Sequence, residues 1–96
     1  MTETSQLDLG PDPSLLLVDD DEIFVTRLAR AMEKRGFATR TALSVNEAMR
    51  MIRESAPAYA VIDLRLEDGN GLDVVEQLRE AREDAHIIVL TGYGAI

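Results

Sequence analysis

The sequence predicts an α/β fold with a parallel sheet. Short aliphatic runs alternate with longer segments whose apolar residues recur at helical spacing, as in right-handed βαβ units. Two of these runs, LLLV and AYAVI, end directly on aspartates, and a third, HIIVL, ends on Thr91. Strands buried on both faces read as continuous apolar runs, and ligands of open α/β sheets bind outside the carboxyl ends of the strands. We therefore expect one polar site where these strands end.

The composition limits the classes of function. The 96 residues suffice for one small domain. A formal charge of -8 opposes binding of this chain alone to a nucleic-acid backbone, and the lack of cysteine excludes disulfides and thiol chemistry. No apolar stretch is long enough to cross a bilayer and the N-terminus lacks the pattern of a signal peptide, so we expect a cytoplasmic protein without a membrane partner.

The first part of the chain predicts a leader, a strand and a helix. Residues 1–13 are polar and acidic and contain two prolines, so we expect a flexible leader before a domain that covers residues 14–96. Residues 15–18 predict a buried strand. The helix that follows should end before Gly36. Its expected core face, at i, i+4, i+7 and i+8, consists of Phe24, Leu28, Ala31 and Met32.

The remainder predicts three more strands and two more helices. Residues 38–42 are weakly apolar and suit an edge strand. Ser44 and Glu47 form a capping box at the start of a helix. The apolar face of this helix consists of Val45, Ala48, Met49 and Ile52. Later elements are a strand at 58–62, a loop at 64–71, a helix with Leu72, Val75 and Leu78 on its inner face, and a strand at 87–90.

The acidic residues at the strand ends call for a physical explanation. Acids at a helix N-terminus stabilise it by about 0.3 to 1 kcal/mol each, which accounts for part of the run from Asp19 to Glu22. Capping does not account for Asp63, because unpaired carboxylates about 4 Å apart repel by about 4 kcal/mol at an effective dielectric constant of 20. Either one carboxyl takes up a proton or a divalent cation binds, and oxygen-only ligands with room for water favour Mg²⁺.

Mg²⁺ beside a carboxylate at a strand end suits phosphoryl transfer to that carboxylate. The cation neutralises phosphoryl oxygens while the carboxylate attacks in line and forms an aspartyl phosphate. Thr91, at the end of the adjacent strand, is then a candidate to donate its hydroxyl to the phosphoryl group. The alternative for Thr91 is a solvent-facing residue that only ends a strand.

Three segments, LLLVDDDE, AYAVIDLRLEDGNGLD and VLTGYGAI, resemble the receiver domain of two-component response regulators. The resemblance runs from Leu15 to the last residue, and within the family it is greatest to the PrrA/RegA/ActR group of redox-responsive global regulators. It implies a flavodoxin-like three-layer sandwich with sheet order 2-1-3-4-5. It also implies that Asp63 is the phosphoacceptor, that Asp19, Asp20, Asp63 and the backbone carbonyl of Arg65 hold Mg²⁺, and that Thr91 is the switch residue. We give Asp21 a role at the helix terminus.

The sequence departs from the family pattern at its C-terminal end. The family places a fifth strand, two helices and an invariant lysine after the switch residue, whereas the sole lysine here is Lys34. We therefore expect a truncated receiver, of sheet order 2-1-3-4, without the fifth strand and the last two helices. Phosphorylation should then be impaired. The strand at 87–90 should be an uncovered edge, which favours dimers, strand exchange or aggregation.

The resemblance implies a phosphoacceptor in signal transduction and not an enzyme with a separate substrate. A sensor histidine kinase would donate the phosphoryl group, and the full-length protein would control transcription through a helix-turn-helix domain absent from this chain. One alternative is a Mg²⁺-dependent aspartyl-phosphate phosphohydrolase, although DDDEI lacks the DxDxT-like pattern of such enzymes. Another is a module that binds a kinase or other partner without being phosphorylated.

Overall fold

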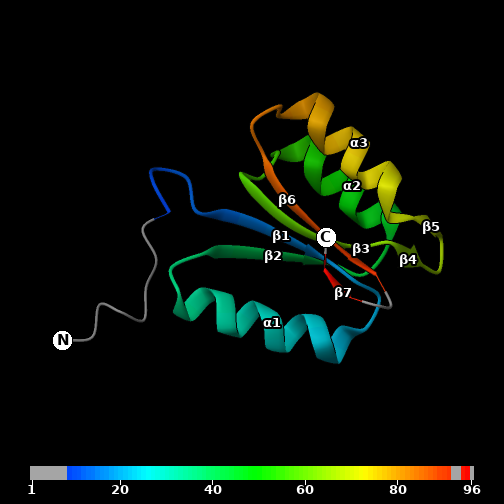
Figure 1. The fold of residues 1–96 in the computed structure, drawn as a ribbon, viewed down its shortest axis with the longest axis horizontal. Coiled ribbons are helices and arrows are strands. Elements are labelled where there is room, and N and C mark those ends of the chain that lie inside the picture. Colours follow the sequence, from blue (N-terminus) through cyan, green and yellow to red (C-terminus); the bar gives the residue numbers. More distant parts are fainter. Residues whose placement is uncertain (1–8, 92–93, 96) are drawn as a thin grey trace.

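The computed structural model describes residues 9–91 and 94–95 and shows three layers (Figure 1). A five-stranded sheet has the order β2-β1-β3-β6-β7, with β7 antiparallel and the others parallel. Its strands are β1 (Ser14–Val18), β2 (Ala38–Ala42), β3 (Tyr59–Asp63), β6 (His86–Thr91) and β7 (Gly94–Ala95). The helices are α1 (Glu22–Lys34) on one face, and α2 (Val45–Glu54) and α3 (Gly71–Ala81) on the other. The predicted α/β sandwich and the order of its four parallel strands are confirmed.

Strand β1 is buried on both faces, which explains its continuous aliphatic run. Leu16 and Val18 of β1 pack in the core under α2 and α3, whereas Leu15 and Leu17 pack against α1. All four side chains are at most 2% exposed. None of the helices within the described residues is long and apolar enough to cross a membrane.

The helix starts are fixed by the capping residues that the sequence shows. The carboxylate of Asp21 accepts a hydrogen bond from the N–H of Phe24 at 3.0 Å, so its predicted role at the start of α1 is confirmed. The predicted cap at Ser44 is also present, since Ser44 accepts from the N–H of Glu47 at 3.1 Å, while the Glu47 carboxylate accepts from the N–H of Leu43, one residue before the cap, at 2.7 Å.

The predicted inner faces of α1 and α3 are partly wrong. The exposed members of the predicted faces are Phe24, which is 41% exposed, Ala31, and Leu72, which is 49% exposed. Leu78 is buried as predicted, whereas the other buried apolar residues are Val25 and Ala29 in α1 and Val74 in α3. Each apolar stripe is wide enough for either choice, and packing against the sheet selects the face. The first-turn residues Phe24 and Leu72 are left exposed.

The predicted loop at 64–71 contains two short strands. β4 (Arg65–Leu66) and β5 (Gly69–Asn70) form an antiparallel hairpin between β3 and α3. The hairpin ends at the cap of α3, where the Asn70 side chain accepts from the N–H of Leu72 at 2.8 Å. This regular pairing corrects the expectation of an irregular loop.

The prediction of an uncovered edge at 87–90 is correct only in part. β7 pairs with the last two residues of β6, in the register Leu90 with Ala95 and Thr91 with Gly94. Among the described residues no strand pairs with the outer side of His86–Val89. The exposed edge is therefore shorter than the sequence indicates.

The end of the predicted leader contacts the domain. Arg82 pairs with Asp12 at 2.7 Å, and the hydroxyl of Tyr59 donates to the carbonyl of Leu9 at 3.1 Å. Residues 1–8 lie outside the described part of the chain. The division of the chain at residue 14 stays a prediction.

Candidate functional site: an acidic pocket at the carboxyl end of the sheet

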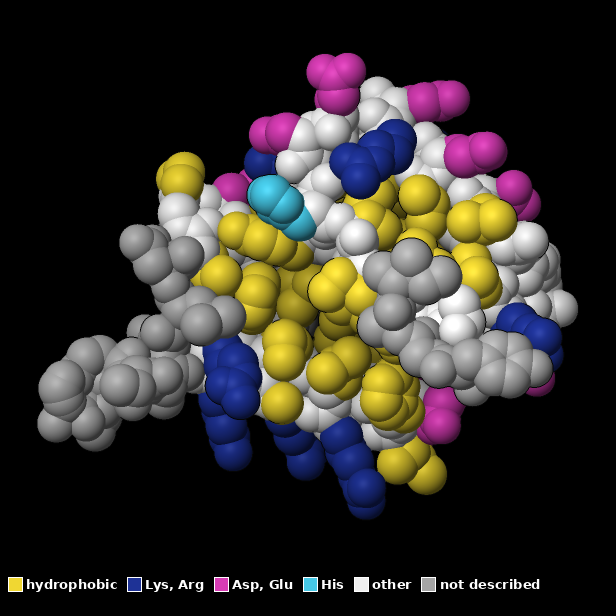
Figure 2. Space-filling model, in the orientation of Figure 1, with side chains coloured by type: hydrophobic (Ala, Val, Ile, Leu, Met, Phe, Trp, Pro, Cys, Tyr) yellow, Lys and Arg dark blue, Asp and Glu magenta, His cyan; other side chains and the backbone are white. Residues whose placement is uncertain are grey.

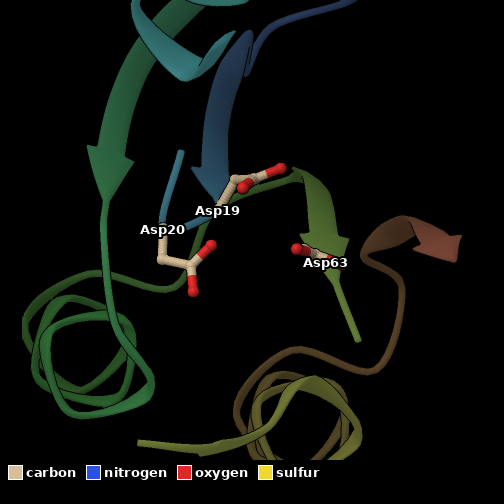
Figure 3. A group of neighbouring side chains, drawn as sticks. All are labelled: Asp19, Asp20 and Asp63. Carbon is tan, nitrogen blue, oxygen red and sulfur yellow. The ribbon is translucent and has the colours of Figure 1, made fainter. Parts of the chain in front are cut away.

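Three aspartates meet where β1 and β3 end. Asp19 and Asp20 follow β1, and Asp63 is the last residue of β3. Because the two strands are parallel and adjacent, their carboxyl ends lie at the same edge of the sheet. One carboxylate oxygen of each aspartate lies within 4.8 Å of those of the other two, around the common space that Figure 3 shows.

Backbone hydrogen bonds hold the two ends of the acidic group. The N–H of Asp19 donates to the carbonyl of Ala42 at 3.1 Å, and its carboxylate accepts from the N–H of Asp21 at 2.9 Å. The carboxylate of Asp63 accepts from the N–H of Arg65 at 3.2 Å. Asp20 is exposed. Two carboxylates are thus oriented by the backbone, and the third faces solvent.

The backbone of Gly71 packs directly against the backbone of Asp63. A Cβ atom built on Gly71 would overlap the backbone carbonyl of Asp63, so no side chain fits at this position. The N–H of Gly71 donates to the carbonyl of Leu64 at 2.9 Å. The start of α3 and the end of β3 therefore pack backbone against backbone, which fixes the position of Asp63.

The pocket is electrostatically unfavourable for its own carboxylates. Partial burial raises the pKa of Asp19 above its ordinary value of 3.8, and the charges of Asp63, Asp20 and Asp21 raise it further. Two charges 4.8 Å apart, the upper limit of the separations here, repel by about 3.5 kcal/mol at an effective dielectric constant of 20, and by less where water screens the exposed Asp20. Among the described residues the ion pairs lie elsewhere. A cation would relieve this repulsion.

The pocket also brings in residues that the sequence did not assign to it. It has a volume of about 440 Å³ and is lined by Asp19, Asp20, Asp21, Phe24, Asp63, Arg65, Leu90 and Thr91. All five predicted site residues line it, including Thr91 at the end of β6. Phe24 and Leu90 were missed, and Asp21, which was given only a role at the helix terminus, also lines the pocket. The signal for Phe24 was its place three residues after the helix cap Asp21, which puts its ring in the first turn, beside the pocket.

The donor set fits a hard divalent cation. It consists of oxygen atoms from three carboxylates within 4.8 Å of one another, and Arg65 lines the same pocket. Mg²⁺ prefers octahedral oxygen coordination and keeps several waters, so a few protein oxygens in an open pocket suffice. The arrangement can hold a cation beside a carboxylate that is itself accessible to a reactant.

Comparison with protein families shows which family the chain that carries this pocket belongs to. The family model of the response regulator receiver domain matches residues 15–96. The chain belongs to this family. The photosynthetic apparatus regulatory protein RegA of Rhodobacter capsulatus is 66% identical over the whole chain, and the acid tolerance regulatory protein ActR of Rhizobium meliloti is 57% identical over 99% of it. The resemblance to this group of regulators is confirmed. The chain spans about half the length of these relatives, 52% and 50% respectively.

Solved structures agree with the receiver fold. A response regulator from Burkholderia pseudomallei, with a phosphorylated aspartic acid, a calcium ion and citrate, has a TM-score of 0.81 at 37% identity over 86% of this chain and 49% of that protein. TrrA of Thermotoga maritima, in complex with Mg²⁺ and BeF, has a TM-score of 0.75 at 28% identity over 83% of this chain and 70% of that protein. The chain is thus a response-regulator receiver domain.

Proposed function

We propose that Asp63 accepts a phosphoryl group from the phosphohistidine of a sensor kinase. The observation that supports this is the position of its carboxylate at the end of β3, in an open pocket of a receiver domain, within 4.8 Å of two further carboxylates. A carboxylate oxygen of Asp63 attacks the phosphorus in line. The new O–P bond forms as the P–N bond of the kinase histidine breaks, and the imidazole nitrogen keeps the bonding electron pair.

Asp19, Asp20, Asp63 and the backbone carbonyl of Arg65 are the proposed ligands of Mg²⁺. The donor set and the mutual repulsion of the carboxylates support this assignment. When bound, the cation supplies positive charge that offsets both the carboxylates and the incoming phosphoryl oxygens. The calcium and magnesium ions named for the two structural relatives belong to those proteins, and we extend only their chemistry, hard cations with oxygen ligands, to this pocket.

Thr91 is the proposed switch residue. It ends β6, the strand that pairs with β3 in a register that sets Asp63 against Leu90, one residue before Thr91. Its hydroxyl is a donor of the right kind for a phosphoryl oxygen on Asp63. The sole lysine, Lys34, lies in α1 and not among the residues that line the pocket.

The test is phosphorylation by a small donor followed by intact mass measurement. Incubation with Mg²⁺ and acetyl phosphate should add the mass of one phosphoryl group to a fraction of the parent chain and none to Asp63→Asn. Asp73→Asn, on the exposed side of α3, is the matched control and should behave as the parent. Equal modification of Asp63→Asn would contradict the assignment of Asp63.

The same preparation separates the phosphoacceptor from the two other functions considered. Turnover of phosphate monoesters would favour the phosphohydrolase over a signalling module. Binding of a cognate kinase that is unaffected by Asp63→Asn, without any modification of the parent, would favour a pure interaction module. The regulatory names of the relatives favour the phosphoacceptor.

The wider role follows by extension from relatives about twice as long. We propose that this chain is the receiver part of a transcription regulator that responds to a redox signal in the cytoplasm. DNA would contact a helix-turn-helix domain outside these residues, because a net charge of -8 opposes direct binding.

Self-association of this chain through its open sheet face is also proposed. Figure 2 shows hydrophobic side chains gathered over the sheet, beside the row of Lys and Arg side chains of α1. An apolar pocket here is lined by Leu15, Met32, Phe37, Tyr59, Ala60, Val61, His86 and Ile88. Ile88 is 48% exposed. Light scattering should give a mass above that of one chain, reduced by Ile88→Asp, and a clean monomer at high concentration would contradict the proposal.

A further inference from the structure

The β4–β5 hairpin carries the backbone carbonyl that we assign to the metal site. The end of the hairpin next to Asp63 is held by two contacts, the hydrogen bond from the N–H of Arg65 to Asp63 and the burial of Leu66 in the core, where it is 8% exposed. The opposite end is the two-residue turn Glu67–Asp68, which lies on the surface. What holds this turn decides how firmly the strand of Arg65 is placed.

Asp68 ties the hairpin turn to the start of α2. Its Oδ1 accepts from the N–H of Val45 at 2.8 Å, and its Oδ2 accepts from the N–H of Asn46 at 3.1 Å. These two hydrogen bonds hold the pKa of Asp68 below its ordinary value of 3.8, so the carboxylate is charged at neutral pH. The next residue, Gly69, packs closely on Val45, since a Cβ built there would lie 3.3 Å from the Val45 Cγ2.

The helix does not depend on Asp68 alone for its cap. First-turn amides have no partner within their helix, and Ser44, the local cap, accepts from the N–H of Glu47. Asp68 accepts from the two amides before that one. The two caps therefore act on the same helix end, but only Asp68 also belongs to the hairpin beside Asp63. This difference separates a role in helix stability from a role in the site.

We propose that Asp68 is a positioning residue of the metal site, which holds the β4–β5 hairpin against α2 and so fixes the carbonyl of Arg65 for Mg²⁺. The inference rests on the proposed function of the pocket. A carbonyl on a strand of two residues keeps its direction only if the strand is fixed at both ends. Groups outside the ligand set that orient the ligands typically change metal affinity by about tenfold or more when removed.

The experiment compares Asp68→Ala with Ser44→Ala, which removes a cap from the same helix but leaves the hairpin attached. Mg²⁺ affinity is measured by isothermal titration calorimetry, and the exchange rates of the Arg65 and Gly71 amides are measured by NMR without metal. Asp68→Ala should weaken Mg²⁺ binding by about tenfold and speed up both exchange rates. Ser44→Ala should lower the melting temperature and leave the affinity and both rates unchanged.

Each outcome decides the inference. Equal loss of affinity in the two variants would show that Asp68 acts only through the stability of α2, and no loss in either would exclude a positioning role. If the parent chain itself binds no Mg²⁺, the proposed metal site fails, and unchanged exchange rates in Asp68→Ala would then overturn the positioning role separately. If Asp68→Ala does not fold, Asp68→Asn takes its place, because it keeps one oxygen acceptor. Asp68→Asn should bind Mg²⁺ more weakly than the parent, by less than the tenfold expected for Asp68→Ala. An affinity of Asp68→Asn equal to that of the parent would overturn the inference.

Discussion

Two aspartates at opposite ends of β1 have pKa values shifted in opposite directions. At the carboxyl end, partial burial and three neighbouring aspartates raise the pKa of Asp19 above 3.8. At the amino end, hydrogen bonds from Ser14 and then from Arg82 lower the pKa of Asp12 to about 2. The ionised form of an aspartate is therefore stabilised at the amino end of the strand, at Asp12, and destabilised at the carboxyl end, at Asp19.

The amino end has the properties of a purely structural region. Arg82 donates to Asp12 at 2.7 Å and to the carbonyl of Ala56 at 3.1 Å, and so links the N-terminal segment to the entry of β3. The ring of Tyr59 stacks on His86 with centroids 5.2 Å apart. Charges are paired here and rings are packed. The carboxyl end keeps like charges together at a cost in stability, as binding and catalytic sites commonly do.

The largest expected effect concerns the backbone that supports the acidic end. Gly71→Ala should lower the free energy of unfolding by at least about 3 kcal/mol, because the new Cβ overlaps the carbonyl of Asp63 and only backbone movement relieves it. Gly10→Ala, at the amino end, is the control. The new Cβ at this position meets no atom within 4 Å. The substitution should lower the free energy of unfolding by only about 1 kcal/mol, because the φ of 74° disfavours a residue with a side chain. Urea denaturation measures both, and equal costs would contradict the tight packing at Asp63.

Mg²⁺ should stabilise the molecule through its acidic end alone. At ten times the dissociation constant the cation should raise the free energy of unfolding by about 1.4 kcal/mol, seen as a higher melting temperature. Asp20→Asn should blunt this gain because it removes a ligand charge. Asp12→Asn, at the amino end, should leave the gain intact. A parent chain whose melting temperature does not respond to Mg²⁺ would leave helix capping as the only role of the acidic run.

The comparison of the two ends also shows what sequence reasoning can reach. The acidic end was predictable because each strand is a continuous apolar run that stops at a polar residue, so the ends of parallel strands identify the pocket without any distance. Asp19, Asp63 and Thr91 line the pocket for this reason. Local capping was predictable as well, because Ser44 and Glu47 are three residues apart.

The contacts that escaped prediction join residues far apart in the sequence. Arg82 and Asp12 are separated by 70 residues, and Asp68 and Val45 by 23, so no local pattern indicates either pair. The β4–β5 hairpin has strands of two residues, too short for an alternating pattern. The inner face of α1 was misplaced because Phe24 is as apolar as a core residue, and only the position of the sheet shows that it lies beside the pocket.

The pH dependence of the acidic end should be smaller than its response to metal. A carboxyl whose pKa is raised on folding adds stability below pH 3.8 and loses that contribution as the pH rises through its folded pKa. Asp19→Asn keeps an acceptor for the N–H of Asp21 and removes the charge. Without divalent cations it should therefore melt above the parent at pH 7, and the difference should shrink as the pH falls. Thermal melts in a chelating buffer measure this. A lower melting temperature for the variant at pH 7 would mean that the Asp19 carboxylate is stabilised in the native state.

The smallest effect is expected at the amino end, where the sign is reversed. The pKa of Asp12 is lowered to about 2, so its contribution to stability is present above pH 3.8 and is lost as the pH falls toward 2. Arg82→Gln should raise this pKa only part of the way to 3.8, because the hydrogen bonds from Ser14 are the larger cause and remain. Carboxyl ¹³C shifts in an NMR titration report it directly. A return to 3.8 in Arg82→Gln would assign the whole shift to the ion pair, whereas no change would assign it to Ser14 alone.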